Sequence, residues 1–271
     1  MTPDVPSPDP TPTRRAVALR LAGHVQPFPP VTLGLMALCV VLYGVVGLED
    51  LQAGRADLVG LLAGPRSPES SILWGAGAAR LAWRGEPWRL LSCTLLHANL
   101  LHLAMNMVAL FGLGRLCESV YGGKRFLWLY LLSGLSGSIL SQSVGLWLHP
   151  HSSTFTVGAS GAVFGLMGAG VVFGWRFRRS LPGPVRQVFG RGLLPWIALN
   201  IFIGFQVPNI DNLGHLGGLA GGALLAFFLG TPVIPGREGS RGSRGAMGLL
   251  SAALLVGTLA AMVHNHMVTR H

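Results

Sequence analysis

The chain has 271 residues, of which 50 % are hydrophobic and only 11 % are charged. A soluble globular domain carries about 25 % charged residues, so this composition excludes an ordinary soluble domain and predicts a membrane protein. The net charge is +10, but the basic residues are divided among several loops and form no single patch, which argues against nucleic-acid binding.

The order of polar and apolar stretches predicts a chain that crosses the membrane repeatedly. Residues 1–30 are rich in proline and lack the apolar stretch of a signal peptide, so we expect a disordered cytoplasmic tail. Most of the uncharged stretches that follow approach the ~17–25 residues of a membrane-spanning helix. A long outer loop over 49–89 follows the first span, and a flexible linker over 231–244 precedes a C-terminal helix over 245–271. We predict spans at 31–48, 90–113, 126–148, 158–175, 193–207, 212–230 and 245–263.

The basic residues predict the orientation of these spans. If the N-terminus is cytoplasmic, 14 of the 20 Lys and Arg residues lie on the cytoplasmic side, as the positive-inside rule requires. Seven spans then leave the C-terminus outside. The cytoplasmic set is Arg14, Arg15, Arg20, Arg115, Lys124, Arg125, Arg176, Arg178, Arg179, Arg186, Arg191, Arg237, Arg241 and Arg244.

Two glycine-rich spans carry the polar residues with the clearest chemistry. Ser160 lies at the N-terminal end of one span, and His215 lies near the start of another. Small residues at helical spacing let two helix backbones approach closely, which would bring hydroxyl and imidazole within about 2.6–3.2 Å. This pairing predicts a nucleophile and a general base, whereas the alternative is a packing role alone. The glycines are Gly161, Gly165 and Gly168 in the first span and Gly214, Gly218 and Gly222 in the second.

A third polar group lies within 90–113. His102 and Asn106 are four residues apart and share one helix face, where both could donate hydrogen bonds to a developing oxyanion. His97 would lie about 140° around the same helix from His102, so we expect it to point elsewhere. A metal site is the rival interpretation, but the stretch lacks the HExxH pattern and a nearby acidic ligand. We therefore expect no metal.

The only carboxylates close to a predicted span are Glu49, Glu118 and Asp211, and all three lie at span ends. Without a pair of aspartates inside the helices, an aspartic intramembrane protease is excluded. Proton-coupled transport is disfavoured for the same reason, because it usually requires buried carboxylates.

These residues, in this order, resemble the rhomboid family of intramembrane serine proteases over about residues 31–230. The resemblance is carried by Trp88-Arg89, by the segment His97…His102…Asn106, by Gly158-x-Ser160-Gly161 and by Gly214-His215-x-x-Gly218. It implies an all-α membrane protein with a six-helix rhomboid-like core, to which the C-terminal helix adds a seventh.

The resemblance also implies roles for individual residues. Ser160 would be the nucleophile and His215 the general base, without an aspartate. His102, Asn106 and the backbone N–H of Ser160 would form the oxyanion hole, and His97 would support the site. Phe164 stands where many family members carry tyrosine, so a ring would still stack on His215, but without a hydroxyl.

Two further roles concern the flanks of the predicted site. Trp88 and Arg89 would belong to an outer loop that lies partly in the membrane. Glu118 would hold a turn on the cytoplasmic side, with Arg115 or Arg125 as its partner.

The implied reaction is hydrolysis of a peptide bond near the outer end of a substrate's transmembrane helix. Water would reach it through a cavity lined by Ser160, His215, His102 and Asn106. We expect transmembrane protein substrates, the lipid bilayer of the plasma membrane as surroundings, and neither a cofactor nor nucleic acid. The sequence indicates no oligomeric state. The alternative function is a catalytically inactive rhomboid-like binder of membrane helices, although such relatives typically lack the serine or the histidine, which are both present here.

Overall fold

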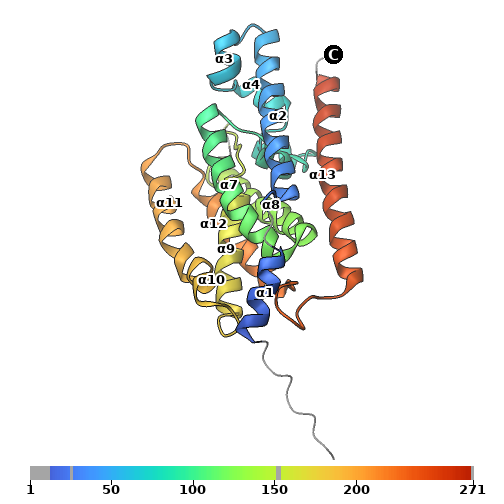
Figure 1. Cartoon of the computed structure of the whole chain (residues 1–271). Helices are drawn as coiled ribbons and strands as arrows, with labels where there is room; N and C mark the ends of the chain where they lie inside the picture. The colour runs from blue at the N-terminus through green and yellow to red at the C-terminus, as the bar shows by residue number, and fades with distance from the viewer. Residues whose placement is uncertain (1–12, 25–26, 151–153, 270–271) are drawn as a thin grey trace, which may run out of the picture.

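Long apolar helices lie side by side in the computed structural model, which describes residues 13–24, 27–150 and 154–269 (Figure 1). Within these ranges, four helices are long and apolar enough to cross a membrane: α2 (Pro30–Gln52), α7 (Leu100–Tyr121), α8 (Gly123–Leu148) and α13 (Arg241–Thr269). Three shorter helices lie among or beside them: α9 (Ser160–Arg176), α11 (Leu194–Gln206) and α12 (Asn212–Phe228). The chain is an all-helical, multi-pass integral membrane protein, as predicted.

The predicted span 90–113 is divided into three pieces. Its first part forms α6 (Arg89–Ser92) and the 3-10 turn η1 (Cys93–Leu95), and α7 begins only at Leu100. The break follows from Asn99, whose backbone is extended and whose side chain accepts a hydrogen bond from the His102 N–H at 2.8 Å. An asparagine in this position caps a helix and so fixes where it starts.

The predicted outer loop is largely helical. It contains α3 (Leu58–Ala63), α4 (Pro68–Leu73) and α5 (Ala79–Trp83). Asp57 caps α3 and Ser67 caps α4, each accepting a hydrogen bond from the N–H three residues later. Short helices with such caps satisfy their backbone groups locally and can therefore form within a polar connection.

The predicted N-terminal tail was wrong for residues 14–24, which form helix α1 (Arg14–His24). Val17 and Leu21 are buried on one face of this helix, so packing stabilises it despite its polar composition. Arg20 of the same helix forms an ion pair of 2.5 Å with Glu238 in the segment before α13. Residues 1–12 of the predicted tail lie outside the described residues, and α13 begins at Arg241, inside the predicted linker.

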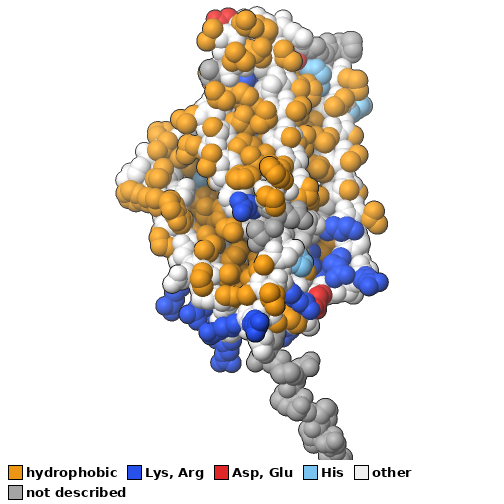
Figure 2. All heavy atoms as spheres, viewed as in Figure 1, with side chains coloured by type: hydrophobic (Ala, Val, Ile, Leu, Met, Phe, Trp, Pro, Cys, Tyr) orange, Lys and Arg blue, Asp and Glu red, His pale blue; other side chains and the backbone are white. Residues whose placement is uncertain are grey.

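α12 packs against α9 and α8, and α9 also contacts α8 and α7. α13 packs on α8 at one side of the bundle, while α11 lies at the opposite flank and contacts α9 and α12 (Figure 1). α1 and α10 (Gly183–Val188) lie at one end of the bundle, and α3 and α4 lie at the other end, near the end of α13 (Figure 1). Figure 2 shows hydrophobic side chains over the length of the bundle and most of the visible Lys and Arg side chains at the end of α1 and α10.

The two predicted glycine faces meet in the structure. A Cβ placed on Gly218 would lie 1.9 Å from the carbonyl oxygen of Gly161, and one on Gly222 would lie 2.1 Å from that of Gly165. No Cβ tolerates such distances, so α9 and α12 are in backbone-to-backbone contact that only glycine permits. This contact sets the distance between the N-terminal ends of the two helices.

Glu118 holds the start of α2 rather than pairing with an arginine. One carboxylate oxygen accepts a hydrogen bond from the Val31 N–H at 3.1 Å. The other accepts from the Thr32 N–H at 2.9 Å and from its hydroxyl at 2.7 Å. The predicted partners Arg115 and Arg125 form no ion pair with Glu118 within the described residues. The physical reason is that the unpaired N–H groups of a helix N-terminus are themselves partners for a carboxylate.

Candidate active site

Ser160 and His215 are in direct contact. Ser160 is the first residue of α9, and His215 lies in the first turn of α12. The Nε2 atom of His215 lies 2.9 Å from Oγ of Ser160, which is a hydrogen-bonding distance. His215 is buried and Ser160 is half-buried, so the hydroxyl keeps limited exposure beside a shielded imidazole.

The local sequence explains why His215 is held at this position. Asp211 precedes α12 and accepts a hydrogen bond from the Gly214 N–H at 2.8 Å, which fixes the first turn of the helix. The Asp211 carboxylate serves this cap, and Nδ1 of His215 has no hydrogen-bond partner among the described residues. The pair thus lacks an acidic third member in this part of the structure. Asp211, three residues before Gly214, fits the pattern of a helix cap and could have been found from the sequence.

Phe164 packs on the face of the histidine. The two rings are stacked with their centroids 4.2 Å apart and their planes 8° from parallel. Phe164 is one turn beyond Ser160 on α9, so one helix supplies both the hydroxyl and the surface on which the imidazole rests.

His102 lies against the segment that leads into α9. A Cβ placed on Gly158 would lie 2.8 Å from Cε1 and Nε2 of His102 and 3.8 Å from Oγ of Ser160. The backbone of Gly158 therefore adjoins both side chains, and its φ of +135° is one that other residues rarely adopt. The Gly158 N–H donates to the carbonyl oxygen of Cys93 at 2.9 Å, which fixes this backbone in place.

The prediction that His97 points away from His102 was wrong. His97 precedes α7, so the helical angle on which the prediction depended does not apply to it. Its buried ring contacts the ring of His102 edge-on, with centroids 5.3 Å apart.

Asn106 is buried on α7, and its Nδ2 donates to the carbonyl oxygen of His102 at 2.9 Å. A cavity of about 30 Å³ is lined by Ser160 and His215, but neither His102 nor Asn106 lines it. Of the four residues expected to line one cavity, Ser160 and His215 line this one. The space is enough for a water molecule.

Arg89 ties down the outer segment that precedes it. This side chain is 2 % exposed and donates to the Glu86 carboxylate at 2.6 Å and to the Ile72 carbonyl oxygen at 2.5 Å. Its guanidinium also lies 4.7 Å from the ring centroid of Trp88. Further along, Gly77 and Thr156 exchange two backbone hydrogen bonds, which join this segment to the chain before Ser160. No sequence pattern predicts that bridge, because it joins two loops.

A helical membrane bundle with a serine and a histidine in contact defines a class: a multi-pass membrane protein with a candidate hydrolase site. A family model described as Rhomboid domain matches residues 84–232, more than half of the chain. The chain belongs to the rhomboid family, as its sequence motifs predicted.

Individual relatives agree with this assignment. Rhomboid protease GluP from Bacillus subtilis (strain 168) is 37 % identical over 208 residues, which cover 77 % of this chain and 38 % of GluP. RHOMBOID-like protein 5 from Arabidopsis thaliana is 35 % identical over 192 residues, 70 % of this chain and 58 % of the relative. Rhomboid protease AarA from Providencia stuartii is 30 % identical over 210 residues, 72 % and 70 % of the two chains. The match thus spans well under two thirds of the length of the first two relatives.

Proposed function

We propose that this protein is an intramembrane serine endopeptidase that cleaves transmembrane proteins, with Ser160 as nucleophile and His215 as general base. The observation that carries the proposal is the distance of 2.9 Å between Oγ of Ser160 and Nε2 of His215. A serine hydroxyl is a weak nucleophile until an adjacent base accepts its proton, and a neutral imidazole is suited to that task. Two of the relatives, GluP and AarA, are named as rhomboid proteases.

In the proposed reaction, Nε2 of His215 takes the proton of Ser160 as Oγ attacks the carbonyl carbon of the scissile bond. The histidine then gives that proton to the leaving amine, and an acyl group remains on Ser160. Water, activated by His215 in the same way, hydrolyses this ester and regenerates the hydroxyl. The small cavity beside the two residues supports the access of one water molecule at this step.

The negative charge of the tetrahedral intermediate requires hydrogen-bond donors. The N–H of Ser160 is at the N-terminus of α9, where backbone N–H groups are free of helical partners and the helix dipole favours negative charge. We assign Asn106 and His102 as the side-chain donors. The His102 ring adjoins Gly158 beside Ser160, whereas Asn106 donates to its own helix here and would have to turn toward the intermediate.

The site's position implies where the substrate is cut. Ser160 and His215 lie at the N-terminal ends of α9 and α12, whereas the other ends of these helices lie toward the basic end of the bundle (Figure 1 and Figure 2). With the basic end in the cytoplasm, cleavage would occur toward the outer side of the plasma membrane.

The experiment that tests the proposal is covalent labelling with a fluorophosphonate probe in detergent or lipid. We expect the wild type and the control Ser141→Ala, which removes a buried serine of α8, to be labelled equally. Ser160→Ala should not be labelled, and His215→Ala should neither label nor cleave a single-span test substrate. A folded wild type that neither labels nor cleaves would instead support the inactive helix-binding alternative. Normal cleavage by His215→Ala would refute the pair.

A further inference from the structure

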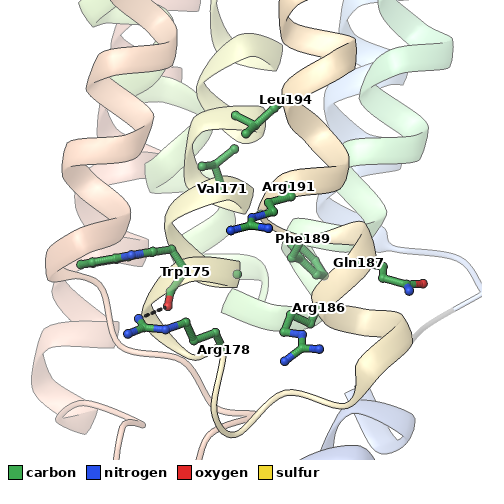
Figure 3. A pocket seen from close by; sticks show the side chains of 10 residues that line it. Val171, Trp175, Arg178, Arg186, Gln187, Phe189, Arg191 and Leu194 are labelled. Carbon is green, nitrogen blue, oxygen red and sulfur yellow. Dashed lines mark hydrogen bonds between the residues drawn. The ribbon is translucent and has the colours of Figure 1, made fainter.

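The end of α9 away from Ser160 forms one wall of a pocket of about 840 Å³, far larger than the space of about 30 Å³ beside the serine. The other walls come from α10, from the 3-10 turn η2 (Arg191–Leu193) and from the start of α11 (Figure 3). Pockets of about 300–1,000 Å³ accommodate ligands the size of typical small molecules, so this one is large enough for a lipid headgroup and the beginning of its chains.

The walls of the pocket are held by close backbone packing. The Gly190 N–H donates to the Gly170 carbonyl oxygen at 3.2 Å, and a Cβ on Gly174 would lie 2.5 Å from the Gly190 nitrogen. The ring of Phe189 packs edge-on against Phe173 of α9, with centroids 5.0 Å apart. The loop between α9 and α11 is therefore fixed to α9, and the pocket is a built feature of the fold.

Three arginines, Arg178, Arg186 and Arg191, line this pocket, and all three are exposed. Arg178 donates to the Trp175 carbonyl oxygen at 3.0 Å, as the dashed line in Figure 3 marks. Within the described ranges, none of the three forms an ion pair with a carboxylate. The sequence explains this, because no Asp or Glu occurs between Glu118 and Asp211. Among the described residues, therefore, no carboxylate pairs with their positive charge.

The neighbouring Arg176, in contrast, is hydrogen-bonded to the end of another helix. Its guanidinium donates to the carbonyl oxygens at the end of α12, including that of Leu229 at 3.1 Å. A cation at a helix C-terminus satisfies carbonyl groups that have no helical partner. Arg176 does not line the pocket, whereas Arg178, Arg186 and Arg191 do.

Apart from Gln187, the rest of the lining carries no polar side chain. Val171 of α9 and Leu194 of α11 lie above the three guanidinium groups in the view of Figure 3. Trp175, also in the lining, is 59 % exposed. Tryptophan is enriched where the hydrocarbon core meets the headgroup layer, so the change from apolar to basic lining falls at that boundary.

We propose that this pocket binds an anionic phospholipid of the surrounding bilayer. The phosphate group would lie among Arg178, Arg186 and Arg191, and the acyl chains would run along Val171 and Leu194 toward the hydrocarbon core. Guanidinium groups form strong, often bidentate hydrogen bonds with phosphate oxygens, and basic pockets between membrane helices bind acidic headgroups. The apolar wall selects a lipid over a free phosphate, because a soluble anion would leave it without a partner. A bound lipid would bridge α9 and α11.

Lipid retention by the full-length chain, measured by native mass spectrometry from detergent, tests the proposal. The probes are the anionic lipid dioleoylphosphatidylglycerol and the zwitterionic lipid dioleoylphosphatidylcholine, with glycerol phosphate as a soluble competitor. The variant is R178Q/R186Q/R191Q. The matched control is R15Q/R237Q/R241Q, which removes the same charge from three exposed arginines that do not line the pocket. Thermal unfolding of each variant establishes that it is folded.

We expect the wild type and the control to retain phosphatidylglycerol in preference to phosphatidylcholine. The pocket variant should bind the anionic lipid about tenfold more weakly or worse, since each basic residue near an acidic lipid contributes separately. Binding of phosphatidylglycerol by the pocket variant as tight as by the wild type would overturn the proposal. An equal loss of binding in the control variant would also overturn it, because the lipid would then be attracted by the total charge at the basic end of the bundle. Displacement by glycerol phosphate alone at similar concentration would show a free-phosphate site instead. Lipid binding does not depend on catalysis, so this outcome is separate from that of the proposed protease.

Discussion

The imidazole of His215 is held between two residues of one helix: Phe164 is stacked on its face at 4.2 Å, and Ser160 meets its Nε2 at 2.9 Å. Nδ1 of His215 has no hydrogen-bond partner in the part of the chain that the structure describes, so in the proposed mechanism ring packing would orient the imidazole, as an acidic residue does in a triad. Rotation of α9 would move Ser160 and the ring stacked on His215 together.

Replacement of Phe164 should therefore impair the reaction through the position of His215. We expect Phe164→Ala to lower kcat about ten- to a hundredfold, because a small misplacement of a catalytic group has effects of this size. Steady-state cleavage of a single-span test substrate measures it. Phe164→Tyr keeps the stacked ring and should stay close to wild type. Full activity of folded Phe164→Ala would show that the stack does not position the histidine.

The glycine contact between α9 and α12 should be necessary for both stability and activity. In Gly218→Ala the added methyl group would meet the Gly161 carbonyl oxygen at 1.9 Å, so the helices must separate. Overpacking of this kind costs about 1–3 kcal/mol, and we expect a lower melting temperature together with slower fluorophosphonate labelling of Ser160.

Gly112→Ala on α7 is the matched control for this prediction. A Cβ there meets nothing within 4 Å, and alanine is the better helix former by about 0.5–1 kcal/mol. It should leave labelling unchanged and the melting temperature unchanged or higher. If Gly218→Ala behaved like Gly112→Ala, close backbone contact would not be what holds Ser160 beside His215.

Repeating patterns explain how much of this fold could be predicted. Apolar stretches of sufficient length predicted the long helices, and glycines at helical spacing predicted the faces along which α9 and α12 meet. Both signals are local and periodic. The same spacing implied that Ser160 and His215 could meet, although their distance of 2.9 Å depends on tertiary packing.

Single capping contacts explain what the sequence did not reveal. One hydrogen bond at Asn99 ends the predicted continuous span and places His97 outside α7, where it reaches His102. The helix in the predicted tail depends on burial of Val17 and Leu21, which the local composition does not indicate. Hydropathy averages over many residues, so contacts made by one or two side chains are invisible to it.

Asn106 should be required for transition-state stabilisation if it has the proposed role of oxyanion donor. We expect Asn106→Ala to lower kcat about 10²- to 10³-fold with little change in KM, as removal of one such donor does in comparable hydrolases. Asn200→Ala is a close control, because Asn200 on α11 also donates to the carbonyl oxygen four residues earlier, at 2.8 Å. Equal effects of the two substitutions would assign Asn106 a helix-stabilising role only.

Glu118 should contribute to stability without contributing to the chemistry. Glu118→Ala leaves the N–H groups of Val31 and Thr32 and the Thr32 hydroxyl without their partner. An unsatisfied buried polar group costs about 1–3 kcal/mol, so we expect a melting temperature several degrees lower. Glu118→Gln, which keeps an accepting oxygen, should lose less, and Glu69→Ala at an exposed position should change little. Cleavage per folded molecule should remain at the wild-type rate, because Glu118 is near the end of α7 opposite to His102. A loss of kcat without a loss of thermal stability would contradict this assignment and link the start of α2 to the active site.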